Sequence, residues 1–455
     1  MSAHLVPDTQ WFRTRDGKGL MAGSPLTYFS VSDAGARILD AIEHDNTLPA
    51  HHFALTHRLL ATGAVHPRPT ESVDTKDITV VIPAYITSPD ALEHLRELVQ
   101  SLMAFTVIVV DDCSPTDFTL ESGTVIQLDS NSGPARARNA GLAHVTTPIV
   151  VFIDTDISVD EMQLLALASY VSVDNVAMVA PRIITTNAKT FLSEYESFHS
   201  PLDLGATDAV VRPMSRVSYV PSAVLMGHVS AFQELNGFNE EMRSGEDVDL
   251  VWRLIESGQL CRYVPSVQCE HTPRISIGAL LKQRFSYGKS AAQLDQKHPR
   301  AASPFRANLF FVLPAVAVLM GFLYLAVPLV VLSVLYVLWT LRALPLPIRS
   351  KITITGIGLR STLISLAQAI HRAWWPLFVV VGGSSIRVGA MLTFSVLFPP
   401  CIGIVRKKPQ FPIRYLVVRM LDNFAYGAGV WAGAWRARSA RCLLPVITVR
   451  RSNAH

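Results

Sequence analysis

The feature that most constrains this chain is an apolar stretch of 33 residues, Leu309–Leu341, that contains no charged side chain. About 20 apolar residues suffice to cross the hydrocarbon core of a bilayer. One continuous helix of this length would extend about 50 Å, well beyond a core about 30 Å thick. Because Pro314, Gly321 and Pro328 interrupt the stretch, we expect either a kinked span or two shorter helices in a hairpin.

A second apolar region, Ala373–Val405, opens with two tryptophans, which favour a membrane interface. Arg387 lies inside this region and argues against a simple span, because a charge at mid-bilayer costs at least about 2.5–3.5 kcal/mol. From residue 301 onward the chain has 17 Lys or Arg and one acidic residue, Asp422. Basic residues flank every apolar block. If basic residues mark the cytoplasmic side of a membrane, this pattern fits re-entrant or interfacial helices, whose two ends lie on the same side, better than alternating spans. The alternative is a buried hydrophobic domain, but basic flanks without acids suit anionic lipid.

The chain before residue 301 has the opposite balance, with 23 bases and 35 acids. Only 17% of the 455 residues are charged and 49% are hydrophobic, which excludes a disordered polyelectrolyte and favours membrane contact. Five scattered cysteines predict neither a disulfide framework nor a zinc site, as fits a reducing cytoplasm. The first ten residues lack the pattern of a cleaved secretion signal. We expect membrane lipid among the partners and no nucleic acid.

Residues 1–70 have the pattern of a small separate module. Short alternating stretches, Gln10–Thr14 and Leu26–Ser30, lie on either side of a glycine-containing turn and predict strands. Two helical patterns follow, and the second ends near Gly63. The polar run from Pro67 to Asp77 is typical of a linker. We therefore expect a module over residues 1–70, a linker over 71–77, a second domain over 78–300 and a basic, apolar helical region over 301–455.

The second domain begins with Ile78–Ile82, a β-branched run typical of a strand buried on both faces of a parallel sheet. Three further runs of this kind follow, at Thr106–Val110, Thr124–Leu128 and Ile149–Ile153. Helical patterns separate most of them, and this order predicts a parallel α/β sheet that extends to about residue 270. Ligands in such sheets bind beyond the carboxyl ends of the strands.

Two pairs of carboxylates follow predicted strands. Asp111 and Asp112 could be turn formers, or they could accept hydrogen bonds from a nucleoside. Asp154 and Asp156 are spaced to hold Mg²⁺ or Mn²⁺, which in turn binds a diphosphate, although this short pattern also occurs by chance. The position of the second pair directly after an apolar strand favours the metal hypothesis.

The remaining polar groups allow two interpretations each. Arg136 and Arg138 follow Pro134, which suits the first turn of a predicted helix, and they could meet phosphates or lie on a solvated face. Glu246 and Asp247 stand at a predicted helix N-terminus, where they could cap the helix for about 0.5–2 kcal/mol, or one could take a proton from a hydroxyl nucleophile. His271 follows the last apolar run and could be structural or a third metal ligand.

The runs ITVVIPAY, VVDDCS, GPARARNAG, FIDTD and GEDVDLVWRL, in this order over residues 77–290, resemble the family 2 glycosyltransferases of the GT-A fold. The resemblance implies an inverting transfer from a nucleotide-diphosphate sugar with a divalent metal, Mg²⁺ or Mn²⁺, and makes Asp247 the general base. It further implies donor-side positions for Pro83, Ala84, Tyr85, Asp111, Asp112, Arg138 and Asp154, metal ligation by Asp154, Asp156 and, as in some members, His271, and acceptor-side positions for Glu246 and Trp252. Residues 282–287 lack the QxxRW pattern of processive members, which argues against secretion of a long polymer.

Residues 1–70 resemble a peptide-binding winged helix of the PqqD type, through the Leu5–Pro7 opening, the turn at Asp16 and the run Ser32–Leu39. Together with the GT-A domain and the basic tail, this resembles the mycofactocin-system glycosyltransferases of actinobacteria. That family implies transfer of glucose from UDP-glucose to a peptide-derived redox cofactor at the inner face of the cell membrane. Two alternatives stay open: a polyprenyl phosphate or glycolipid acceptor, or a membrane-anchored scaffold without enzymatic activity.

Overall fold

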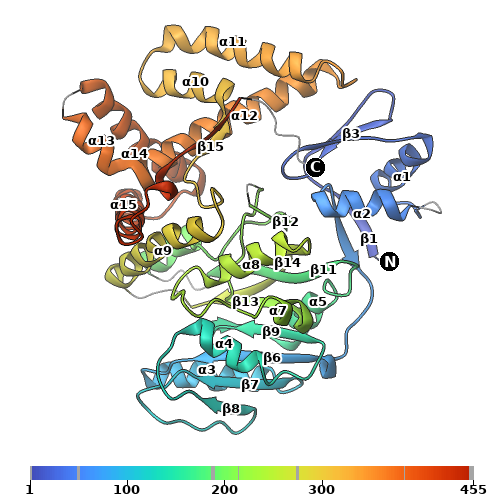
Figure 1. Ribbon diagram of the computed structural model, residues 1–455, viewed down its shortest axis with the longest axis vertical. Helices are drawn as coiled ribbons and strands as arrows, with labels where there is room; N and C mark the ends of the chain where they lie inside the picture. The colour runs from blue at the N-terminus through green and yellow to red at the C-terminus, as the bar shows by residue number, and fades with distance from the viewer. Residues whose placement is uncertain are drawn as a thin grey trace. The chain divides into compact units, whose positions relative to one another are not determined.

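The computed structural model describes residues 3–48, 52–185, 190–213, 215–272, 276–383 and 385–449 (Figure 1). The chain forms two compact units. The first comprises residues 1–11, 20–189 and 199–273, and the second comprises residues 12–19, 190–198 and 274–455. The first unit therefore contains most of the N-terminal module and the central sheet, and the second contains the apolar helices.

The N-terminal module contains the strands and helices that its sequence predicts. In chain order its elements are β1 (Ala3–Pro7), β2 (Trp11–Arg13), β3 (Gly19–Ala22), β4 (Thr27–Ser30), α1 (Asp33–Glu43), α2 (Phe53–Thr62) and β5 (Val65–Pro69). Ser32 caps α1 through Gly35 N–H, and α2 ends at Gly63, whose φ is 69°. The linker expectation was wrong for Pro67–Pro69, because β5 pairs antiparallel with β1 and an edge strand tolerates proline.

The central sheet of the first unit is mixed rather than wholly parallel. Among the described residues its order is β10–β14–β11–β13–β9–β6–β7–β8, with β12 beside β14. The strands are β6 (Ile78–Ala84), β7 (Thr106–Asp111), β8 (Thr124–Gln127), β9 (Ile149–Ile153), β10 (Ile157–Ser158), β11 (Val176–Thr185), β12 (Ala209–Val211), β13 (Val224–His228) and β14 (Leu260–His271).

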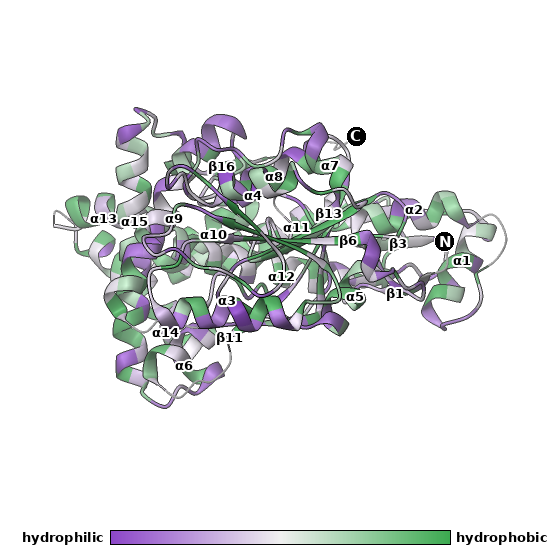
Figure 2. Cartoon of the chain, turned by 90° about the horizontal axis from the view of Figure 1, so that it is seen from below, coloured by the Kyte–Doolittle hydropathy of each residue, from purple (hydrophilic) through white to green (hydrophobic). Residues whose placement is uncertain are grey.

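The parallel arrangement predicted from sequence holds for the four adjacent strands β9, β6, β7 and β8. It was wrong beyond β9, because β13 runs antiparallel to both β9 and β11. A buried strand has the same apolar pattern in either direction, so its composition did not reveal the reversal. The central strands, seen edge-on in Figure 2, are coloured as hydrophobic and form the core of this unit.

Helices flank this sheet and bring chain segments to its edge. They are α3 (Pro89–Ser101), α4 (Pro134–Leu142), α5 (Glu161–Ala168), α7 (Val229–Glu234) and α8 (Glu246–Glu256). Pro134 occupies the first turn of α4, as predicted. Gly141 lets α4 approach the sheet closely, because a Cβ there would overlap the side chain of Val81. This close packing fixes α4 over the strands that carry the site.

The second unit is mainly helical. Its helices are α6 (Phe191–His199), which belongs to this unit through Phe198, α9 (Ile277–Lys297), α10 (Leu309–Leu319), α11 (Leu323–Thr340), α12 (Ile348–Ala369), α13 (Trp375–Gly382), α14 (Ile386–Lys407) and α15 (Pro412–Arg436). A π-helical turn, Ile370–Trp374, joins α12 to α13, and the short strands Arg306–Asn308 and Val446–Thr448 pair in parallel.

The long uncharged stretch forms two helices, α10 and α11. Of the two expectations from sequence, that of two shorter helices is therefore confirmed and that of a single kinked span is wrong. The chain breaks at Gly321, whose φ is 75°, while Pro314 and Pro328 lie inside α10 and α11. The prolines therefore do not end the helices. Within the described residues, the segments Leu323–Thr340, Ile348–Gly382 and Ile386–Lys407 are long and apolar enough to cross a membrane. Their length and composition indicate membrane association.

Candidate active site

The site is built at the carboxyl ends of β6, β7 and β9, which neighbour one another in the sheet (Figure 1). The register pairs Ala84 of β6 with Asp111 of β7. Asp154 follows directly after β9, and its N–H donates to Ala223 O at 3.0 Å. The parallel pairing of these strands therefore brings the polar residues that follow them to one edge of the sheet.

Asp111 and Asp112 are buried and organise the loops around this edge. Asp112 accepts the N–H groups of Ser132 and Gly133 at 2.7 and 2.8 Å, which fixes the loop that leads into α4. Asp111 Oδ1 accepts the N–H of Ser114 at 3.0 Å. Both carboxylates therefore have a local structural role, and their contact with a nucleoside stays a prediction.

The end of β6 presents one aromatic ring to solvent. Ala84 is buried, Pro83 is partly buried, and the Tyr85 side chain is 50% exposed. The N–H of Asp112 donates to Ala84 O at 2.8 Å, so the backbone here is fixed by the neighbouring loop. Of the three donor-side residues predicted at the end of β6, only Tyr85 offers a side chain of substantial exposed area.

Arg138 connects three of the sequence motifs. Its Nη2 donates to Asp154 at 2.6 Å and its Nη1 donates to Glu246 at 3.0 Å, while the guanidinium lies over the ring of Phe238. Burial lowers the pKa of Arg138, but the charges of Asp154 and Glu246 outweigh it and hold the pKa above its usual value. The alternative of a solvated basic face was wrong for Arg138, which is buried, whereas its neighbour Arg136 is exposed.

Asp247 lies in the first turn of α8. Its Oδ2 accepts the N–H of Ser222 at 3.3 Å and its Oδ1 accepts the N–H of Val248 at 2.8 Å. Burial and the adjacent carboxylate of Glu246 raise the pKa of Asp247 to about 7, against the opposing effect of Arg138. A pKa near the working pH is what a general base requires.

The capping alternative for Glu246 and Asp247 was wrong. The N-cap of α8 is Gly245, whose φ is 82°, and no side chain caps the helix there. Glu246 is instead buried against Arg138, at the contact between α8 and α4. Glu246 therefore belongs to the charged cluster around Arg138, whereas Asp247 accepts a first-turn N–H of α8, that of Val248.

Asp156 and His271 meet because β10 pairs with β14. The register places Ile157 opposite His271, and Thr272 N–H donates to Asp156 O at 3.0 Å. His271 Nε2 lies 3.2 Å from Asp156 Oδ2, and the Asp156 side chain is 47% exposed. In the described part of the chain, His271 Nδ1 is buried without a hydrogen-bond partner. Asp156 is accessible, His271 is buried behind it, and together they offer a nitrogen and oxygens suited to a divalent cation.

The full set of three protein ligands is not assembled. Within the described ranges, no three His, Cys, Asp or Glu side chains converge on one metal position. Asp154 is held by Arg138, and burial together with the charge of Asp156 raises its pKa although Arg138 opposes this. Mg²⁺ is commonly held by one or two carboxylates plus substrate phosphates. The residues present fit such a site through Asp156 and His271.

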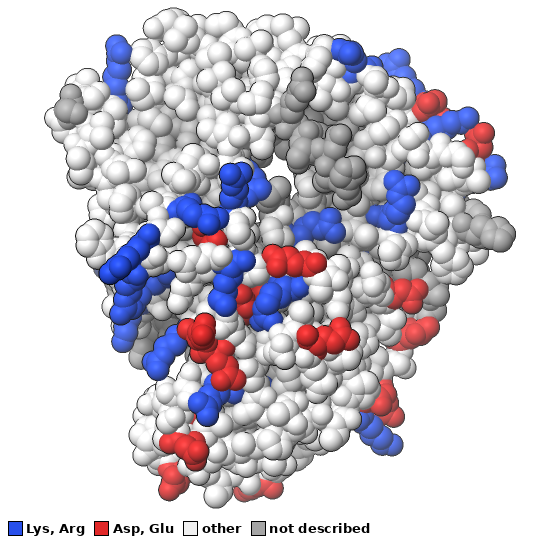
Figure 3. All heavy atoms as spheres, in the orientation of Figure 1, with Lys and Arg blue, Asp and Glu red and all other residues white. Residues whose placement is uncertain are grey.

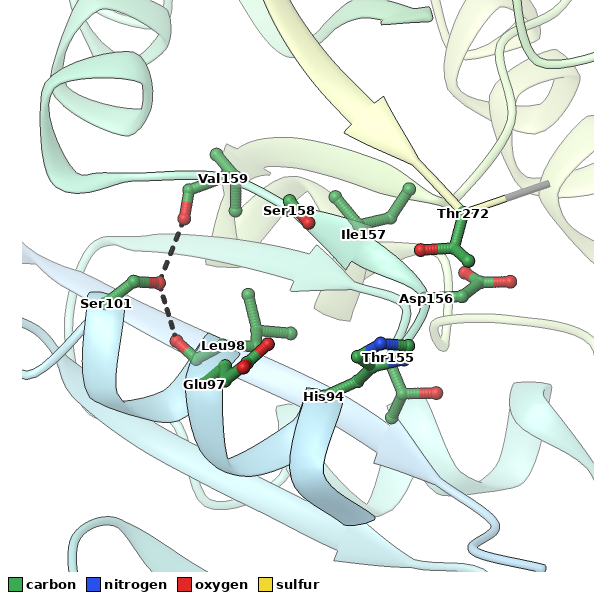
Figure 4. Close-up of a pocket in the computed structure, with 10 residues that line it drawn as sticks. All are labelled: His94, Glu97, Leu98, Ser101, Thr155, Asp156, Ile157, Ser158, Val159 and Thr272. Atoms are coloured by element: carbon green, nitrogen blue, oxygen red, sulfur yellow. Dashed lines mark hydrogen bonds between the residues drawn. The ribbon is translucent and has the colours of Figure 1, made fainter. Parts of the chain in front are cut away.

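A cavity of about 280 Å³ lies beside Asp156, between α3 and β10 (Figure 4). Its lining includes His94 and Glu97 of α3, together with Ser158 and Thr272. Figure 4 shows His94 close to Thr155. Sequence analysis missed His94 and Glu97, although both stand next to the buried Leu95 and Leu98 that mark the inner face of α3. The helical periodicity could have placed them at its border.

Trp252 is nearly fully buried, and its indole N–H donates to Ser218 O at 2.7 Å. The side chain fixes the segment around Ser218. Four residues further along this segment, the N–H of Ser222 donates to Asp247. An acceptor-side role for Trp252 stays a prediction, and it would act through this segment rather than by its own exposed ring.

The sequence profile of Glycosyl transferase family 2 matches residues 79–235. The "Pre-mycofactocin glycosyltransferase" of Mycobacterium tuberculosis is 34% identical over 95% of this chain and 95% of that protein. The chain belongs to glycosyl transferase family 2. As a family 2 glycosyltransferase it has the GT-A type of mixed α/β domain, and Asp111, Asp112 and Asp154 lie at that domain's strand ends.

Other similar proteins match less of the chain or match it at lower identity. The "Succinoglycan biosynthesis protein ExoO" of Rhizobium meliloti is 27% identical over 42% of this chain and 59% of that protein. Among solved structures, the mannosyltransferase PcManGT from Pyrobaculum calidifontis, in complex with GDP-Man and Mn²⁺, covers 85% of this chain and 96% of its own. Its TM-score is 0.44 at 14% identity.

Proposed function

We propose that this family 2 glycosyltransferase transfers glucose from UDP-glucose, with inversion, to the peptide-derived redox cofactor mycofactocin or its precursor. The end-to-end likeness to the pre-mycofactocin glycosyltransferase, over 95% of both chains, supports the acceptor class. The chemistry is supported by one observation above all: a partly buried carboxylate, Asp247, whose pKa is raised to about 7. UDP-glucose comes from the resemblance, since no single residue encodes glucose.

In the proposed reaction, Asp247 takes the proton of an acceptor hydroxyl. The hydroxyl oxygen forms a bond to the anomeric carbon from the face opposite the diphosphate, and the bond between that carbon and the diphosphate oxygen breaks. The nucleotide leaves as the diphosphate, and the proton stays on Asp247 until solvent removes it. General-base action of this kind contributes about 10²–10⁴-fold to the rate.

The donor is proposed to bind along the strand ends. Pro83, Ala84, Tyr85, Asp111 and Asp112 would surround the nucleoside. Asp156 and His271 would hold a divalent cation, Mg²⁺ or Mn²⁺, which neutralises charge on the leaving diphosphate when bound. Asp154 would join them only if its contact with Arg138 loosens, because that contact engages one of its carboxylate oxygens.

Residues 1–70 are proposed to bind the peptide from which the acceptor derives, as the PqqD-like pattern implies. Residues 78–300 would form the transferase domain and residues 301–455 the membrane-associated region, with the transferase domain on the cytoplasmic side. A polyprenyl phosphate or glycolipid acceptor is the second candidate, favoured by the apolar segments of membrane-spanning length within the described residues.

The test offers UDP-glucose and Mn²⁺ to the full-length protein with either the peptide-derived acceptor or a polyprenyl phosphate. Mass spectrometry then looks for the gain of one hexose on each acceptor. We expect hexose on the peptide-derived acceptor, its loss in Asp247→Asn, and its retention in the matched variant Asp174→Asn, whose side chain is exposed before β11. Product on the polyprenyl phosphate alone would replace the acceptor, and no UDP release with either would refute the enzymatic function.

A further inference from the structure

Helix α15 carries a stripe of apolar side chains along one side. The stripe is exposed near its two ends and partly covered between Leu421 and Trp435, where the Trp431 indole N–H donates to Ala373 O at 2.7 Å. The exposed fractions are 79% for Ile413, 48% for Val417, 41% for Leu421 and 87% for Trp435. At 3.6 residues per turn, these four positions fall within about 80° of one another around the helix axis. Large apolar side chains aligned in this way indicate a surface that is covered in the working protein.

Both ends of this stripe are basic. The exposed bases are Arg406, Lys408 and Arg414 at one end and Arg436 and Arg438 at the other. The one acid of the last third, Asp422, is buried inside the unit, where it accepts from Arg284 at 3.0 Å and from Tyr195 at 2.7 Å. It therefore does not offset the surface charge. In Figure 3 basic side chains gather on the side where Figure 1 shows α9 and α15.

The opposite side of α15 packs against α9, and the two backbones come very close. A Cβ at Gly288 of α9 would overlap Tyr426 O, and a Cβ at Gly429 of α15 would overlap Phe285 O. α9 is rich in charged and amide side chains, so it cannot lie in hydrocarbon. Because α15 is packed along α9, and α9 cannot enter hydrocarbon, α15 cannot cross the membrane core.

The chain arrives at α15 directly from a segment of spanning length. α14 ends in Arg406 and Lys407, and the turn at Lys408, whose φ is 49°, leads into α15. A span that ends in basic residues ends at the headgroups of the bilayer, and it delivers the next helix to that level.

We propose that α15 lies in the plane of an anionic lipid surface. The exposed ends of its stripe, Ile413 to Leu421 and Trp435, enter the boundary between headgroups and acyl chains, and the bases beside them contact lipid phosphates. α9 stays on the aqueous side. This surface is independent of the glycosyl-transfer chemistry, and it gives the second unit a fixed orientation to the membrane.

The position of α15 is tested with spin labels on the full-length protein in lipid nanodiscs. The accessible thiols Cys113 and Cys401 are first replaced by serine, and single cysteines are placed at Val417, Leu421 or Trp435. Oxygen and a water-soluble relaxation reagent then report the depth of each label. A label at Gln293 on the exposed side of α9 and one at Val331 within α11 serve as aqueous and lipid references.

We expect the three α15 labels to have the same shallow depth. A spanning helix would instead separate positions 417 and 435 by about 27 Å at 1.5 Å per residue, and this result would overturn the proposal. Labels open to the aqueous reagent would overturn it as well. Labels that neither oxygen nor the water-soluble reagent reaches, and that show spin–spin coupling between two copies of the protein, would also overturn the proposal, because a second copy would then cover the stripe.

The charge requirement is tested by comparing nanodiscs of phosphatidylcholine with nanodiscs that also contain phosphatidylglycerol. The variant Arg406→Gln, Lys408→Gln, Arg414→Gln removes three bases from α15's start, and Arg37→Gln, Lys76→Gln, Arg96→Gln removes the same charge from exposed positions of the first unit. Three bases shift an interfacial equilibrium about a hundredfold. We expect the anionic lipid to deepen the Leu421 label in wild type and control but not in the first variant. Equal depth in both lipids for the wild type would refute the anionic partner.

Discussion

Arg138 donates to Glu246 at 3.0 Å, and this contact joins α4 to the first turn of α8 in the interior of the protein. The same guanidinium holds Asp154, the first residue after β9. One arginine therefore connects the residue before the proposed general base, Asp247, with the residue that begins the proposed metal motif. The cluster therefore fixes the start of α8 relative to the end of β9.

Arg138→Ala should destabilise the fold, because it leaves Asp154 and Glu246 without their counter-charge. Removing one partner of a buried ion pair costs about 3–5 kcal/mol. Arg138→Lys should recover only part of the loss, since an ammonium cannot reproduce the two-sided contact. Urea unfolding measures both. Arg136→Ala, on the exposed side of the same helix, is the matched control and should change stability by less than about 0.5 kcal/mol. Equal effects at the two positions would contradict the role assigned to Arg138.

Asp247→Asn should reduce turnover by about 10²–10⁴-fold while the affinity for UDP-glucose changes little, because the amide is nearly isosteric but cannot accept the proton. UDP release measures turnover, and calorimetry with the donor measures affinity. A variant that turns over at the wild-type rate would exclude Asp247 as the base.

The pH profile should follow the ionisation of Asp247. Because burial and Glu246 raise its pKa to about 7, kcat/KM should rise about tenfold per pH unit below that value and level off above it. Glu246→Gln removes the neighbouring negative charge, so the rising limb should move to lower pH. An unmoved limb in Glu246→Gln would show that another group controls the profile.

The raised pKa of Asp247 also predicts a stability effect. An unfolded chain ionises this carboxyl near its ordinary value of 3.8, whereas the folded chain keeps the proton until about pH 7. The folded state therefore loses stability as pH rises between these values. Asp247→Asn removes this penalty and should stabilise the protein at pH 8, on the order of 2–4 kcal/mol, with little effect below pH 4. Thermal unfolding at the two pH values measures the difference.

Asp156→Asn and Asp154→Asn should behave differently. Asp156 is half-exposed and contacts His271, so Asp156→Asn should keep the wild-type melting temperature. Its Mn²⁺-dependent donor binding should fall by about 10–100-fold, and His271→Gln should lose donor binding to the same extent. Asp154→Asn should lower the melting temperature as well, because it weakens the contact with Arg138. Wild-type protein treated with a chelator is the reference for metal-free donor binding. Donor binding that is insensitive to the chelator would exclude the metal site.

Local patterns predicted much of the first unit. The β-branched runs became β6, β7, β8 and β9, and Pro134 began α4 as its position indicated. Strand direction beyond β9 was not predictable, because a buried strand is apolar whichever way it runs. The pairing of β5 with β1 was missed for a related reason: proline disfavours most strands, and only an unpaired edge removes that cost.

The sequence by itself determined the family, the charged residues that carry the proposed chemistry and the presence of apolar segments long enough to span a membrane. Tertiary structure alone decided which charges meet. Arg138 and Glu246 are 108 residues apart, and His271 is 115 residues from Asp156. Spacing along the chain describes local periodicity only. The pKa of a side chain depends on its burial and on neighbouring charges, and only folding buries the side chain and brings those charges within a few ångströms.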